Sequence, residues 1–138
     1  MPNHFHFLIQ IKSEDTKRIK NNIGILLSSY TKAINKSKNR TGGLFQNHTK
    51  AKLIDDEKYM WDLMIYIHQN PLRNAMVKAI SEWEFSSYRD LAGLRNGTLV
   101  DKSLISKKFR STEEFILSSS TKIEKFDYMF NDTQMEST

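Results

Sequence analysis

The chain of 138 residues contains no cysteine, and it has no apolar run approaching the roughly 20 residues that cross a bilayer. The missing cysteine excludes a disulfide framework and any metal site built on thiolates. The first four residues also lack the basic and apolar regions of a signal peptide. We therefore expect a protein of the reducing cytoplasm that does not insert into a membrane.

Basic residues are present in excess and are unevenly distributed. The net charge is +5, made up of +8 over residues 12–52, +1 over residues 53–110 and −4 over residues 111–138. A length of 138 residues, with 38% hydrophobic and 27% charged residues, suits one globular domain. The basic first third is what a polyanionic partner requires. A lysine-rich helix face that is simply solvated would give the same pattern.

Residues 3–12 alternate between apolar and mostly polar side chains, which is typical of a β-strand. Every second residue from Phe5 to Ile11 is apolar, and His4 and His6 occupy the opposite face. Two neutral imidazoles on one face of a strand can bind a divalent cation together. Taken alone, such a pair is better explained by chance or as two surface histidines than as a metal site.

Helical spacing marks two longer elements. Apolar residues recur at helical intervals over residues 14–36, and Gly42 and Gly43 indicate a turn after them. A second helix begins with Asp55 or Asp56 as its cap and should end near Asn70, before Pro71. We also expect extended segments at 44–45 and 49–54, an irregular segment with packing aromatics at 83–88, and weaker helices at 101–109 and 112–125.

The second predicted helix carries the candidate for nucleophilic chemistry. Tyr66 and Asn70 are four residues apart, so that they lie one turn apart on the same face. A phenol can act as a covalent nucleophile, and the Asn70 amide oxygen can serve as a metal ligand beside it. Tyr59 is the second candidate nucleophile and Gln69 the second candidate ligand. An ordinary core stripe formed by Tyr59, Leu63, Tyr66 and Asn70 is the alternative explanation.

Several short segments, in this order, resemble a known family. They are residues 1–9 (MPNHFHFLI), 29–31 (SYT), 43–46 (GLFQ), 66–73 (YIHQNPLR) and 83–88 (WEFSSY). Their order over about residues 1–92 is similar to that of the REP-associated tyrosine transposases and their insertion-sequence relatives. These are single-tyrosine enzymes of the His-hydrophobic-His (HUH) class. The remainder of the chain matches only loosely.

The resemblance implies a metal-dependent transposase that cuts and rejoins single-stranded hairpin DNA through a 5′-phosphotyrosine intermediate. Tyr66 would be the nucleophile, and His4, His6 and Asn70 would hold Mg²⁺ or Mn²⁺. The protein would be nucleoid-associated, and its active sites could be paired in a homodimer. Candidate contacts to the DNA backbone are Lys32, Lys36, Lys38, Arg40 and Arg73. We expect His48 and His68 to be structural or incidental.

The resemblance also implies a fold of the α+β class, ferredoxin-like, with a mainly antiparallel sheet and helices on one face. In the family, a strand and a helix precede the His-hydrophobic-His strand, whereas this sequence begins on that motif. We therefore expect a truncated catalytic core over residues 1–92 and a helical extension with a frayed tail over residues 93–138. A DNA-hairpin-binding remnant without catalysis is the main alternative function. A purely structural domain would show neither metal dependence nor affinity for DNA.

Overall fold

The computed structural model describes residues 5–12, 14–45, 51–121 and 123, and its regular elements are all helices. The chain divides into two compact units, which are described separately. The α1 unit comprises residues 8–53, and the core unit comprises residues 1–7 and 54–138. The helices are α1 (Thr16–Lys38), α2 (Glu57–Arg73), η1 (Ile80–Glu82, a 3₁₀ helix), α3 (Tyr88–Leu91), α4 (Ser103–Lys108) and α5 (Thr112–Ser120).

The expected ferredoxin-like sheet is wrong, because the described residues contain helices and no strand. Residues 5–12, predicted as a strand, have no regular structure, and Phe7 is 61% exposed. The described parts of the other two extended segments, 44–45 and 51–54, form no strand either. Alternation is a local signal, whereas a strand also needs a neighbouring strand to pair its backbone groups. No such neighbour is present in the described ranges.

The helix predicted over residues 14–36 is confirmed as α1, shifted by two residues. Asp15 caps its start, with the carboxylate accepting a hydrogen bond of 2.9 Å from the backbone N–H of Arg18. Asn39 ends it in the left-handed conformation, at φ 47°, and donates its backbone N–H to the Asn35 carbonyl. Across the described part of the chain, neither α1 nor any other helix combines the length and apolar character of a membrane span.

Replacing Gly24 by alanine should stabilise α1 by about 0.5–1 kcal/mol. Gly24 lies inside this helix, and an added methyl group would meet no atom within 4 Å. The gain therefore comes from the reduced backbone freedom of the unfolded chain. Far-ultraviolet circular dichroism during thermal unfolding would measure it. Lower helicity in Gly24→Ala would contradict the placement of Gly24 in open space.

The second predicted helix is confirmed as α2, with Asp56 rather than Asp55 as its cap. The Asp56 carboxylate accepts the backbone N–H of Tyr59. The predicted end before Pro71 is wrong, since α2 continues to Arg73. Pro71 is buried, and the helix is closed beyond it by a hydrogen bond of 3.1 Å from the Asn74 N–H to the Asn70 carbonyl. So near the helix end, packing offsets the one hydrogen bond that proline removes.

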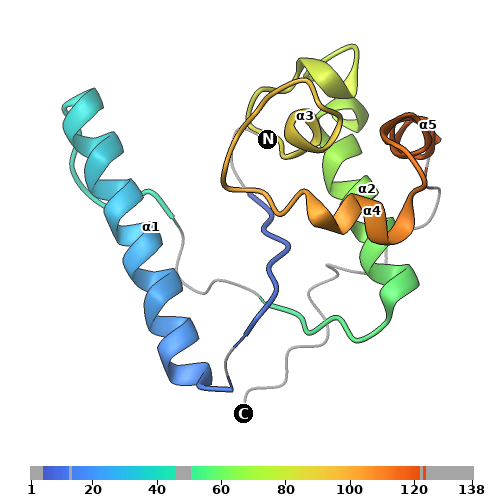
Figure 1. Ribbon diagram of the computed structural model, residues 1–138. Coiled ribbons are helices and arrows are strands. Elements are labelled where there is room, and N and C mark those ends of the chain that lie inside the picture. The colour runs from blue at the N-terminus through green and yellow to red at the C-terminus, as the bar shows by residue number, and fades with distance from the viewer. Residues whose placement is uncertain (1–4, 13, 46–50, 122, 124–138) are drawn as a thin grey trace. The chain divides into compact units, whose positions relative to one another are not determined.

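The hydrophobic core of the core unit is built around α2. Figure 1 shows α3, α4 and α5 gathered around this helix. Aromatic rings meet edge to face within it: the ring centroids of Trp61 and Phe109 are 5.7 Å apart, and those of Phe109 and Phe115 are 5.4 Å apart. The buried cluster consists of Trp61, Met64, Ile65, Ile80, Tyr88, Leu91, Ala92, Ile105, Phe109 and Phe115. The helix α2 thus contributes Trp61, Met64 and Ile65 to the core and also carries Tyr66 and Asn70.

The aromatic residues of segment 83–88 only partly pack as expected. Tyr88 is buried in the core, as predicted, whereas Phe85 is 86% exposed. The Phe85 ring contacts Trp83 with the centroids 5.6 Å apart. The expectation that Phe85 is a packing aromatic is met only by its contact with Trp83, since the rest of its side chain is exposed to solvent.

Candidate functional site

The last two turns of α2 bring together three of the predicted site residues: Tyr66, Asn70 and Arg73. Tyr66 is partly buried, and the Arg73 guanidinium carbon lies 5.0 Å from the centroid of its ring. The Arg73 Nη1 also donates a hydrogen bond of 2.8 Å to the carbonyl of Ile123. The candidate nucleophile therefore stands under a fixed positive charge, a cation–π arrangement.

Asn70 is buried one turn after Tyr66 and is 5% exposed. Its backbone carbonyl accepts the side-chain Nδ2 of Asn74 at 2.8 Å. Within the described residues, its own side-chain amide takes part in no hydrogen bond. The Asn70 amide oxygen thus accepts no hydrogen bond in this part of the chain.

Gln69, the alternative ligand, is occupied by the segment that follows α5. Its Nε2 donates to the carbonyls of Ser119 and Thr121 at 2.9 and 2.7 Å. Its Oε1 accepts the backbone N–H of Ile123 at 3.4 Å. These three bonds use both ends of the amide, so that binding a metal through Gln69 would require breaking one of them.

Of the two predicted histidine ligands, His6 is described and His4 lies outside the described residues. His6 is half-buried and falls in the same compact unit as Tyr66. Over the described ranges, no three His, Cys, Asp or Glu side chains are grouped closely enough to hold a metal ion. That finding does not cover the predicted set of His4, His6 and Asn70, which stays a prediction. His48 also lies outside the described residues.

The predicted DNA-contact residues are divided between the two units. Lys32, Lys36 and Lys38 are exposed along α1, and Arg40 follows the end of that helix. The Arg40 Nη2 donates to the carbonyl of Gly43 at 3.2 Å, which orders the turn. Arg73 belongs to the core unit. The α1 unit thus presents a basic helix, and the core unit presents one arginine beside the candidate nucleophile.

His68 lies in the core on a different face of α2 from Tyr66, which fits the structural role predicted for it. It is 1% exposed, and its Nε2 is 2.8 Å from the Ser87 Oγ. The rings of Tyr88 and Phe115 pack against it edge to face. Burial lowers the pKa of His68 from 6.5 to about 4. His68 is therefore neutral at physiological pH.

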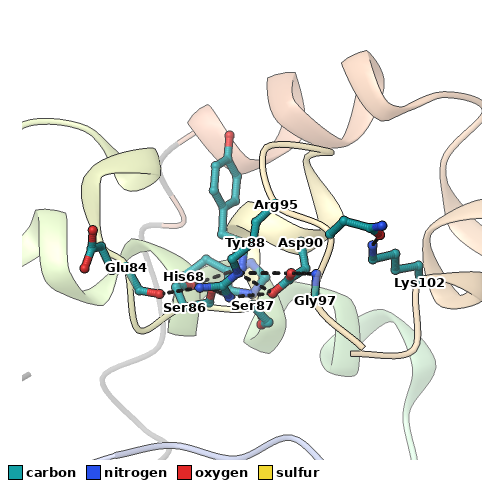
Figure 2. A network of polar contacts seen from close by, with 10 residues as sticks. His68, Glu84, Ser86, Ser87, Tyr88, Asp90, Arg95, Gly97 and Lys102 are labelled. Carbon is teal, nitrogen blue, oxygen red and sulfur yellow. Dashed lines mark hydrogen bonds and ion pairs between the residues drawn. The ribbon is translucent and has the colours of Figure 1, made fainter. Parts of the chain in front are cut away.

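An ion pair between the buried Asp90 and the exposed Arg95, shown in Figure 2, was not predicted from the sequence. The Arg95 Nε donates to both Asp90 oxygens, and its Nη1 and Nη2 donate to the carbonyls of Glu84 and Ser86 at 2.7 and 2.9 Å. The Asp90 side chain is only 3% exposed. The hydrogen bond from Arg95, followed by one from the Gly97 N–H, lowers the pKa of Asp90 to about 2. This network fixes the loops on either side of α3.

Replacing Gly97 by alanine should lower the free energy of unfolding by about 1–3 kcal/mol. The new methyl carbon would lie 2.5 Å from the Asp90 Oδ1. Asp90 cannot retreat without losing its bonds to Arg95 and to the Gly97 N–H. Urea unfolding would measure the loss. Gly24→Ala is the matched control, because the same change in open space should stabilise; an equal effect of both would contradict the steric cause.

Comparison with known proteins gives one informative match. Over 98 residues the chain is 28% identical to a Haemophilus influenzae protein named "Putative REP-associated tyrosine transposase", covering 64% of this chain and 54% of that protein. The chain thus spans about half the length of the curated relative it matches. No protein-family model matches the chain, and no solved structure matches it. The similarity is therefore to a transposase, at the level of a distant relative.

Proposed function

We propose that this chain is a DNA strand transferase of the transposase type, which cleaves and rejoins single-stranded hairpin DNA with Tyr66 as the nucleophile. The observation that carries the proposal is the position of Tyr66, partly buried on the helix α2, with the Arg73 guanidinium 5.0 Å from its ring. The distant similarity to a transposase supports the same class of activity.

The proposed reaction keeps the energy of the phosphodiester bond. The Tyr66 phenol oxygen gives up its proton and attacks the scissile phosphorus, and the bond from phosphorus to the 3′-oxygen breaks. The 3′-oxygen leaves as a hydroxyl after taking up a proton, and the 5′-phosphate stays on Tyr66. Attack by another 3′-hydroxyl reverses these steps and rejoins the strand. The Arg73 guanidinium, 5.0 Å from the Tyr66 ring, would offset negative charge as it develops on a phosphate held at Tyr66.

A divalent ion, Mg²⁺ or Mn²⁺, belongs to the proposal as an expected requirement. Asn70 fits this role, because its amide oxygen is one turn from Tyr66 and free of hydrogen bonds within the described residues. His6 belongs to the same compact unit, and His4 would be the third ligand. When bound, such an ion polarises a phosphate oxygen and offsets its charge.

The proposal is tested by trapping the covalent intermediate. The full chain is incubated with a panel of single-stranded hairpin DNAs and Mn²⁺, and a denaturing gel then reveals any protein–DNA adduct. We expect an adduct with the unmodified chain. No adduct should form with Tyr66→Phe, or when EDTA is present from the start of the incubation. Tyr59→Phe is the matched control, since it removes the other candidate hydroxyl on α2. An adduct that survives Tyr66→Phe and disappears in Tyr59→Phe would overturn the assignment of the nucleophile.

The second candidate function is hairpin binding without cleavage. The exposed lysines of α1 favour it, because backbone contacts by lysine need no catalytic geometry. It predicts binding that persists in EDTA and in Tyr66→Phe, with no adduct on any hairpin.

The homodimer expected from the sequence is a separate question. Sedimentation of the chain with and without DNA would show whether it forms.

A further inference from the structure

A pocket of about 470 Å³ lies in the core unit beside Arg73. Its walls include Leu72 and Arg73 from the end of α2, Ala79 and Ile80 at the start of η1, Tyr88 from α3, and Ser120 at the end of α5. This volume falls within the range of small-molecule sites, about 300–1,000 Å³. The residue roles proposed for cleavage, metal binding and backbone contact leave this pocket without a ligand.

Apolar side chains and the Tyr88 ring with its hydroxyl set the chemistry of the pocket. Leu72 and Ile80 provide apolar wall surface. Tyr88 is 5% exposed, and in the described part of the chain its hydroxyl forms no hydrogen bond. Burial raises the pKa of Tyr88, so that the phenol keeps its proton and remains a donor. A ligand with an acceptor at this wall of the pocket would give the Tyr88 hydroxyl a hydrogen-bond partner.

Arg73 links this pocket to the candidate nucleophile. Arg73 lines the pocket, its guanidinium carbon lies 5.0 Å from the centre of the Tyr66 ring, and its Nη1 donates to the Ile123 carbonyl. Guanidinium groups bind phosphate and also stack on planar bases. A ligand with a planar, apolar face, an acceptor at its edge and an attached phosphate would match all three features. An unpaired nucleotide has this combination.

We propose that this pocket receives one unpaired nucleobase next to the phosphate attacked by Tyr66, and that it thereby selects the cleavage position. The base lies against Leu72 and Ile80, an acceptor on its edge meets the Tyr88 hydroxyl, and Arg73 bridges to the phosphate. The part concerning cleavage rests on the proposed function of Tyr66, whereas binding of a base to the pocket does not.

Binding is tested without any cleavage, by nuclear magnetic resonance on the full chain. The ¹⁵N-labelled protein is titrated with each deoxynucleoside 5′-monophosphate and with deoxyribose 5-phosphate, which has no base. We expect the amides of Ala79, Ile80 and Ser81 to shift with the nucleotides only. Ala79→Trp should fill the pocket and abolish these shifts, whereas Leu99→Trp, at a 97% exposed position, should not. Equal shifts with deoxyribose 5-phosphate, or none at all, would overturn the base pocket.

Selection of the cleavage position is tested on hairpins with a single abasic site placed at successive positions around the scissile phosphate. We expect one abasic position to slow adduct formation by about 5- to 150-fold, which corresponds to the loss of about 1–3 kcal/mol of stacking from one base. Ala79→Trp should be slow on the intact hairpin and insensitive to that position. If no hairpin gives an adduct, the strand-transferase function fails, and the titration still decides the pocket. If the rate of adduct formation is the same with every abasic position, the proposed selection of the cleavage position by the pocket is overturned.

Discussion

Replacing Phe115 by alanine should lower the free energy of unfolding of the core unit by about 3–5 kcal/mol. Phe115 is fully buried, at 0% exposure. Its ring meets those of His68, Tyr88 and Phe109, with centroid distances of 6.2, 5.7 and 5.4 Å. Residues from α2, from α3 and from the end of α4 thus converge on this side chain. Its removal loses both the transfer energy and the edge-to-face contacts, and leaves a cavity that the surrounding rings cannot fill.

The loss is measured by urea unfolding followed through tryptophan fluorescence, since Trp61 packs on Phe109 in the same cluster. Leu117→Ala is the matched control on the same helix, because Leu117 is 72% exposed and should change stability by no more than about 0.5 kcal/mol. Similar losses in the two variants would mean that α5 does not present Phe115 to the core.

Lowering the pH from 6.5 to about 4 should cost the folded state up to about 3 kcal/mol through His68 alone. The unfolded chain takes up the imidazole proton near pH 6.5, whereas burial delays uptake in the folded chain until about pH 4. Between these values the unfolded state binds more protons, so the free energy of unfolding falls as the pH falls. Above pH 6.5 His68 is largely neutral in both states, so this loss of stability is absent.

Urea unfolding at several pH values between 7 and 4 measures this slope, and His68→Gln should flatten it. Glutamine can still bond to the Ser87 hydroxyl but does not titrate in this range. Asp90 serves as the internal reference, because its lowered pKa of about 2 moves its own loss of stability to lower pH, below about 4. An unchanged slope in His68→Gln would show that another group takes up the proton.

Local signals predicted the two long helices well. The apolar spacing that predicted a helix over 14–36, and the Asp56 cap before residue 57, act within one or two turns, so the rest of the chain cannot easily override them. The strand over 3–12 failed for the opposite reason. Its alternation fits a sheet, but pairing depends on segments distant in sequence, and the described residues provide none.

Only the part of the site that depends on helix geometry could be predicted from the sequence. A spacing of four residues places Tyr66 and Asn70 one turn apart, and the structure keeps them on α2. Arg73 was predicted as a DNA contact, and the sequence offers no sign that Ile123, 50 residues later, holds its guanidinium near Tyr66. The Asp90–Arg95 pair was missed because both lie in short, irregular surroundings without periodicity.

The hydrogen bonds of Gln69 have a consequence for the order in which the core unit folds. They join α2 to residues that are 50 to 54 positions further along the chain. Helices form from neighbouring residues, whereas closing a loop of this length costs entropy before any contact compensates for it. We therefore expect α2 and α5 to acquire helical structure early. The anchoring of Arg73 through Ile123, and with it the setting of Tyr66, would then be among the last events.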